Sequence, residues 1–151
     1  MAVTARYVHT NLTARDARRL AMFYQDVFGC VPVVTGQVYS GEWVDRITGI
    51  AGAEIDVTHL RLPGDEPGPT LEIIQYNQPK EGQRPAANRP GWGHIAFAVE
   101  DVEAALQAVR AAGGSNVGEI ISDDLPGRGR LTAVYATDPE GNVVEMQHWA
   151  K

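Results

Sequence analysis

The sequence reads YVHTNL at residues 7–12 and WGHIAF at residues 92–97, two stretches that begin one pattern twice. Both have the length and composition of a β-strand with a histidine in its middle. In each case an aspartate follows seven residues after the histidine, and a glycine follows twenty residues after it. These residues are Asp16 and Asp101, and Gly29 and Gly114. The chain therefore predicts a unit of strand and helix that occurs twice.

Apolar residues at helical spacing predict an amphipathic helix over about residues 14–28. Thr13 or Asp16 is suited to accept the free amide hydrogens at its start, and Gly29 to end it. A second helix begins at Asp101 and ends at the glycine pair that follows its last apolar residue. Both helices are amphipathic, so each needs a sheet to cover.

Further strands are predicted between each helix and the end of its half. They lie near residues 31–40, 53–62 and 69–76, and near residues 117–122, 130–137 and 142–149. The run DPEGN at residues 138–142 predicts a tight turn, because proline fixes one φ and glycine supplies a positive one. The fold class is α+β, with two tandem βαβββ modules at about residues 5–77 and 91–150. A proline-rich linker covers about residues 78–90 of what we expect to be a single domain.

The last strand of each half carries a glutamate among apolar residues, LEIIQY at residues 71–76 and VEMQHW at residues 144–149. A glutamate in such a place is costly to bury unless its charge is compensated. Each half thus supplies one histidine and one glutamate at matching positions. Two imidazoles and two carboxylates suit a divalent ion such as Zn²⁺, Ni²⁺, Co²⁺, Mn²⁺ or Fe²⁺. The candidate metal ligands are His9, Glu72, His94 and Glu145.

Other reactive residues have simpler interpretations. His59 and His148 have no partner in the repeat, and both are interpreted as structural or surface residues. Cys30 has no base nearby in sequence, which favours a buried thiol over a nucleophile. The run GRGR at residues 127–130 is either a grip for an anionic group or, more commonly, a solvated hairpin loop.

Composition excludes several classes of function. The chain has 151 residues, a net charge of −6 and one cysteine, which leaves no basic surface for nucleic acid and no internal disulfide. No run approaches the roughly 20 apolar residues that span a bilayer, and no signal peptide is evident. The expected location is the cytoplasm, and neither nucleic acid nor membrane is an expected partner.

Two motifs resemble those of the vicinal oxygen chelate superfamily, which includes glyoxalase I, methylmalonyl-CoA epimerase, extradiol dioxygenases and antibiotic-resistance proteins. They are HTNL at residues 9–12 leading to FYQDVFG at residues 23–29, and DPEGNVVE at residues 138–145. The resemblance implies two modules that form an incomplete mixed β-barrel around a metal site. It also implies that the ligands of that metal are His9, Glu72, His94 and Glu145.

The expected function is that of a metal-dependent lyase or isomerase of glyoxalase or epimerase type, which stabilises an enediolate of a small oxygenated substrate. Glu145 is the candidate base, with Glu72 as its partner. One alternative is a protein of this fold that binds and sequesters a small molecule such as an antibiotic. A third is a dioxygenase of extradiol type. The resemblance also implies a homodimer, whose metal ligands come from one chain or from two.

Overall fold

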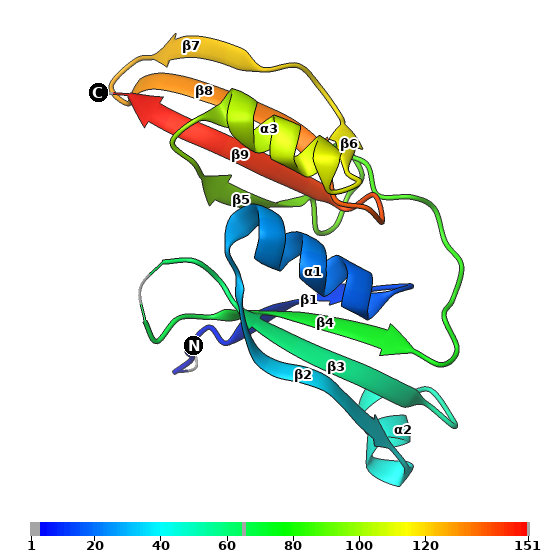
Figure 1. Cartoon of the computed structure of the whole chain (residues 1–151). Helices are drawn as coiled ribbons and strands as arrows, with labels where there is room; N and C mark the ends of the chain where they lie inside the picture. The colour runs from blue at the N-terminus through cyan, green and yellow to red at the C-terminus, as the bar shows by residue number, and fades with distance from the viewer. Residues whose placement is uncertain (1–3, 65, 151) are drawn as a thin grey trace. The chain divides into compact units, whose positions relative to one another are not determined.

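The computed structural model describes residues 4–64 and 66–150, which form two compact units that divide between Glu81 and Gly82. Each unit has its own sheet and its own long helix (Figure 1). That the two units together make one domain stays a prediction.

The first unit is a four-stranded mixed sheet with two helices. Its elements are β1 (His9–Thr13), α1 (Ala17–Phe28), β2 (Val31–Ser40), α2 (Glu42–Thr48), β3 (Glu54–Arg61) and β4 (Thr70–Tyr76). The strand order is β1-β4-β3-β2, with β1 parallel to β4 and the other neighbours antiparallel. This order places β4 between the first strand of the unit and β3.

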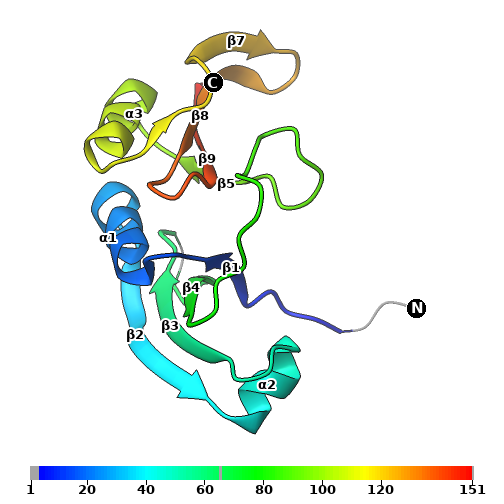
Figure 2. The ribbon, with the colours of Figure 1, turned by 90° about the vertical axis from the view of Figure 1, so that its right-hand side faces the viewer.

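Helix α1 covers one face of that sheet and contacts β2, β3 and β4 (Figure 2). Asp16 is its N-cap, and the Asp16 carboxylate accepts a hydrogen bond from the amide of Arg19 at 2.9 Å. Gly29 ends the helix with a left-handed φ of 68°. Both termini agree with the sequence prediction, except that the first helical residue is Ala17.

Helix α2 covers part of the opposite face, and no periodic sequence pattern predicts it. Its Val44 is fully buried against an apolar cluster on β2, β3 and β4. This cluster includes Ile55 and Val57 of β3 and Ile74 of β4. Because side chains alternate along a strand, His59 and Glu72 lie on the same face as this cluster.

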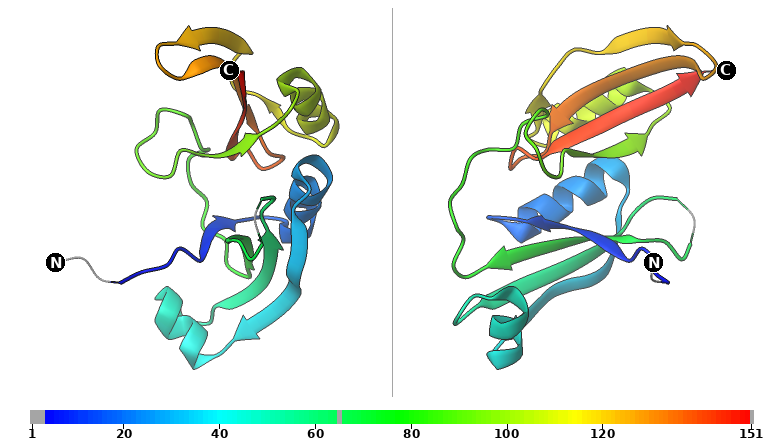
Figure 3. Two further views of the ribbon diagram at one scale, coloured as in Figure 1. Left: turned by 90° about the vertical axis from the view of Figure 1, so that its left-hand side faces the viewer. Right: turned by 180° about the vertical axis from the view of Figure 1, so that it is seen from behind.

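The second unit repeats the arrangement with a five-stranded sheet. Its elements are β5 (His94–Ala98), α3 (Val102–Ala111), β6 (Ser115–Asn116), β7 (Ile121–Leu125), β8 (Gly129–Thr137) and β9 (Val143–Ala150). The strand order is β5-β9-β8-β6, with β7 also paired to β8 and with β5 parallel to β9. Helix α3 contacts β6, β8 and β9 and lies across one face of the sheet (Figure 3).

Two expectations for the second unit need correction. The strand predicted near residues 117–122 is two strands, β6 and β7, which pair with different parts of β8. The helix ends at Ala111, and Gly113 rather than Gly114 has a positive φ, of 94°. The turn at residues 138–142 is present as predicted, with Gly141 at a φ of 90°.

The predicted fold class, α+β with two tandem modules of strand, helix and strands, is confirmed. Both sheets are mixed, and neither closes on itself within the described residues. Among those same residues, no helix has the length and the hydropathy to cross a membrane.

Candidate metal centre

Strand β4 and its two neighbours place several polar side chains on one face of the first sheet. In its register with β1, Asn11 lies opposite Glu72, and His9 lies opposite Thr70. In its register with β3, His59 lies opposite Glu72. The neighbouring residues Leu60, Leu71 and Ile73 are buried on the other face, towards α1. The alternation of these strands therefore directs the polar side chains away from the helix.

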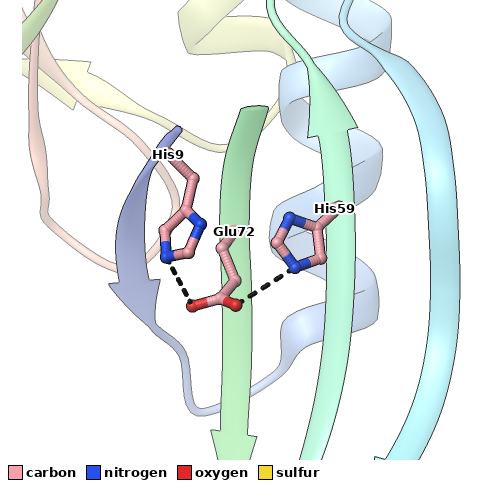
Figure 4. Close-up of side chains that lie close together, drawn as sticks. All are labelled: His9, His59 and Glu72. Atoms are coloured by element: carbon pink, nitrogen blue, oxygen red, sulfur yellow. Dashed lines mark ion pairs between the residues drawn. The ribbon is translucent and has the colours of Figure 1, made fainter. Parts of the chain in front are cut away.

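The two histidines flank the carboxylate of Glu72 (Figure 4). His9 Nε2 lies 3.6 Å from Oε1, and His59 Nε2 lies 3.1 Å from Oε2. The side chains of His9, His59 and Glu72 are 38%, 22% and 16% exposed, so the group is partly shielded and still reachable from solvent. Asn11 Nδ2 also donates a hydrogen bond to Oε1 at 3.2 Å. Glu72 thus has a polar partner on either side.

The second sheet holds the corresponding pair. His94 Nε2 lies 2.9 Å from Oε2 of Glu145, and their side chains are 31% and 16% exposed. Tyr135 of β8 lies opposite Glu145 in the β8–β9 register, and its ring centroid is 4.8 Å from that of His94. His94 and Glu145 therefore occupy in this unit the places that His9 and Glu72 occupy in the first.

The donor set of the first unit fits a divalent ion. One ligand atom from each of His9, His59 and Glu72 can be chosen so that all three lie within 4.8 Å of one another. Two imidazole nitrogens and a carboxylate oxygen are ligands that Zn²⁺ and the neighbouring transition metals accept. His94 and Glu145 add the same two donor types in the second unit. The residues present thus suit a divalent metal ion.

The structure places His9 beside Glu72 in the first unit and His94 beside Glu145 in the second. That all four residues, His9, Glu72, His94 and Glu145, bind one ion stays a prediction, as does the catalytic role of Glu72 and Glu145. His59, interpreted from sequence as a structural or surface residue, lies in the cluster. The sequence contains a pattern that indicates this position. His59 alternates with Ile55 and Val57, and therefore lies on the same face of its strand as these two buried residues.

The remaining candidates lie outside this cluster. His148 donates its Nδ1 hydrogen to the carbonyl oxygen of Val99 at 3.0 Å. Cys30 is buried, as predicted, and burial raises the pKa of its thiol to about 11, which disfavours the nucleophilic thiolate. The GRGR run forms part of a hairpin, in which Arg130 Nη1 makes an ion pair with Asp124 Oδ2 at 3.0 Å. Arg128 lies over the ring of Trp149.

Comparison with known proteins gives relatives along almost the whole chain. Lactoylglutathione lyase of Haemophilus influenzae is 29% identical over 144 residues, which cover 92% of this chain and 89% of the relative. A 2-epi-5-epi-valiolone epimerase of an Actinomyces species is 31% identical over 145 residues, which cover 91% and 76% of the two chains. The crystal structure of a glyoxalase family protein from Bacillus cereus matches with a TM-score of 0.83, at 16% identity and over 99% and 97% of the two chains.

The family model of the Glyoxalase/Bleomycin resistance protein/Dioxygenase superfamily matches residues 6–146. That range contains β1, β4 and β5, and it ends one residue after Glu145 in β9. All four predicted ligands therefore lie within the matched region. The chain belongs to the Glyoxalase/Bleomycin resistance protein/Dioxygenase superfamily.

Proposed function

We propose that this chain is a divalent-metal-dependent lyase or isomerase that moves a proton next to a carbonyl group of a small oxygenated substrate. The observation that carries the proposal is the paired histidine and glutamate, formed once in each sheet at equivalent places. A chance histidine beside a glutamate is common in proteins. The same pair at the same register of two repeated units favours a shared chemical task.

The relatives support this class of reaction. One is named a lyase and another an epimerase, at 29% and 31% identity. A superfamily member with both histidine–glutamate pairs is suited to either the lyase or the epimerase reaction, since each of these reactions begins when a base removes a proton from carbon.

His9, Glu72, His94 and Glu145 would hold the ion. A divalent ion bound there would polarise a substrate carbonyl and make the neighbouring C–H acidic. The chain itself must then supply a base, and a carboxylate that is firmly held is a poor one. The environments of the two glutamates differ in this respect.

Glu145 is the better base. Glu72 has His9, Asn11 and His59 around its carboxylate, at 3.6, 3.2 and 3.1 Å. Glu145 has one recorded side-chain partner among the described residues, His94 at 2.9 Å. A carboxylate with one partner turns more readily towards a substrate carbon than one held from two sides. Glu72 is then the partner that stays in place.

Hydrogen–deuterium exchange on carbon tests proton transfer without knowledge of the product. The purified protein, loaded in turn with Zn²⁺, Ni²⁺, Co²⁺ and Mn²⁺, is mixed in D₂O with thiohemiacetals, α-hydroxyketones and acyl thioesters. NMR then follows the loss of the proton next to each carbonyl. Glu145→Gln should slow that loss by about 100-fold or more, the usual contribution of a general base.

A matched control is Glu119→Gln, which changes an exposed glutamate of the same unit. Its exchange rate should equal that of the unchanged protein. If Glu145→Gln exchanges as fast as Glu119→Gln, Glu145 is not the base. Tight binding of these compounds without any exchange would instead favour the sequestering role.

One observation favours a second candidate. His9, His59 and Glu72 are two histidines and one carboxylate, the donor set of many non-haem Fe(II) oxygenases. Oxygen uptake by the Fe²⁺-loaded protein in the presence of catechols would identify this activity. Absence of uptake, with proton exchange present, would leave the lyase or isomerase.

A further inference from the structure

His59 is the residue of the cluster that neither the repeat nor the family resemblance assigns. It comes from β3, whereas the predicted ligands of the first unit come from β1 and β4. Its ring meets the carboxylate of Glu72 from the side opposite to His9 (Figure 4). The His9 and His59 ring centroids are 5.5 Å apart, and the two rings meet edge to face. Three side chains from three neighbouring strands thus converge.

The second nitrogen of His59 is also engaged. His59 Nδ1 lies 2.9 Å from the hydroxyl oxygen of Thr70, which can donate or accept a hydrogen bond. When Nδ1–H donates to Thr70, Nε2 carries a lone pair directed at the Glu72 carboxylate. That arrangement is repulsive by itself and becomes favourable when a cation lies between nitrogen and oxygen. In most metal sites, a histidine ligand binds the metal through one ring nitrogen and donates a hydrogen bond from the other.

The distances agree with ligation. Two atoms each bound about 2.1 Å from one ion, at an angle of 90–110°, lie roughly 3.0–3.4 Å apart. His59 Nε2 and Glu72 Oε2 are 3.1 Å apart, within this range. His9 Nε2 and Glu72 Oε1, at 3.6 Å, need to approach by only a few tenths of an ångström. One ligand atom from each of the three residues lies within 4.8 Å of the other two.

The second unit lacks these features. The register places Ala96 where the first unit has Asn11, and Val143 where it has Thr70. Tyr135 takes the place of His59 opposite the glutamate. The second unit therefore has no counterpart of the Asn11 amide donor, the Thr70 hydroxyl or the His59 imidazole. The two halves therefore share one histidine and one glutamate and differ at these three neighbouring positions.

We propose that His59 is a further metal ligand, so that the first unit supplies three ligands to the ion, His9, His59 and Glu72. This inference rests on the proposed function, since it concerns the same metal. Three ligands from one sheet would hold the ion without help from Glu145, and the Glu145 carboxylate would then be available as a base.

Cobalt(II) binding tests the inference without any substrate. The full-length protein, stripped of metal, is titrated with Co²⁺ and followed by its visible absorption. His59→Gln should weaken Co²⁺ affinity by more than about 100-fold, since loss of an outer-shell partner alone costs 10–100-fold. Thr70→Val, which removes the hydroxyl partner of Nδ1, should fall within that smaller range. His148→Gln is the matched control, a histidine bonded to Val99 outside the cluster, and should bind as the unchanged protein does.

Proton NMR of the cobalt-loaded protein in H₂O separates a ligand from a residue that only positions Glu72. Each coordinated imidazole gives one strongly shifted, exchangeable N–H signal. Three such signals are expected from His9, His59 and His94, and His59→Gln, at saturating Co²⁺, should lose one. Retention of every signal and of full affinity in His59→Gln would overturn the inference and leave the proposed function intact. If the unchanged protein bound no Co²⁺, both proposals would fall.

Discussion

The Asp138 side chain is 1% exposed and holds the turn between β8 and β9 together. Its carboxylate accepts hydrogen bonds from the amides of Glu140 and Asn142, at 2.9 and 3.0 Å, and from Asn142 Nδ2 at 2.8 Å. The turn leads directly into the strand that carries Glu145. A single buried acid thus fixes where that strand begins.

Asp138→Ala should lower the free energy of unfolding by roughly 2–4 kcal/mol, because it leaves several part-buried donors without their acceptor. Urea unfolding followed by tryptophan fluorescence measures the change. Glu119→Ala, at an exposed site, is the control and should change stability by less than about 0.5 kcal/mol. Equal stability of the two variants would show that water replaces the carboxylate at no cost.

Cys30 provides a prediction on pH. Burial raises the pKa of its thiol from 9.0 to about 11, so the folded state binds the thiol proton more tightly than the unfolded state. The resulting stability is complete below pH 9 and is lost as the pH rises towards 11. The difference in unfolding free energy between the unchanged protein and Cys30→Ala should therefore shrink by up to about 2 kcal/mol between pH 8 and pH 11. A difference that stays constant over this range would contradict the shift.

At the level of elements, the two glycines matched in the repeat act for different reasons. Gly29 ends α1 in a left-handed conformation, with open space where a Cβ would be. A Cβ at Gly114 would lie 2.2 Å from the carbonyl oxygen of Thr137 and 2.6 Å from Val109 Cγ1. Gly114 is needed for close packing between the end of α3 and β8.

Gly114→Ala should therefore destabilise the protein by about 1–3 kcal/mol or more, because the backbone must move to admit the methyl group. Gly118→Ala is the control, since Gly118 has neither a close neighbour nor a positive φ. Thermal unfolding of both variants measures the difference. A destabilisation of the same size in both would mean that crowding at Gly114 is not the cause.

The elements that could be predicted are those with a long and regular pattern. The spacing of apolar residues in α1 and α3 and the alternation in β4 and β9 sufficed to predict them. Helix α2 is only seven residues long and buries only Val44, so no periodic pattern marked it. The strand near residues 117–122 was misplaced because it is interrupted, a property set by its pairing with β8 rather than by its own composition.

The candidate site was predictable in part for the same reason. The histidine–glutamate pairs repeat at equal spacing from each strand's start, which the sequence displays. His59 lies 13 residues before Glu72, whereas Tyr135 lies 10 residues before Glu145, because the connections between the strands differ in length. Only the strand register shows that His59 and Tyr135 occupy equivalent positions, each opposite the glutamate of its own unit. Hence the repeat alone could not bring His59 into the site.

At the scale of the whole molecule, metal binding should be linked to stability. An ion that binds only the folded protein stabilises it by about 2.7 kcal/mol when free metal is 100-fold above its Kd. Removal of metal with a chelator should then lower the Tm by roughly 5–10 °C, by the usual relation for a chain of this size. Calorimetry with and without added Zn²⁺ measures this. His9→Gln should abolish the difference, and an undiminished difference in that variant would exclude His9 as a ligand.

The association of two chains and the cytoplasmic location stay predictions. Mixing His9→Gln with His94→Gln distinguishes the two ways of building a four-ligand site. If the ligands come from two chains, one site of each mixed dimer is intact and metal binding returns. If they come from one chain, the mixture binds no better than its components.

The position of β1 at one end of the strand order has a consequence for the order of assembly. Strands β2, β3 and β4 are consecutive neighbours and pair over short stretches of chain, whereas Asn11 and Glu72 are 61 residues apart. Contacts that close a long loop form later than local ones. During synthesis His59 and Glu72 can therefore meet first, and His9 joins them only when the five-residue strand β1 docks. At the proposed metal site, His9 would therefore be the last ligand of the first unit to come into place.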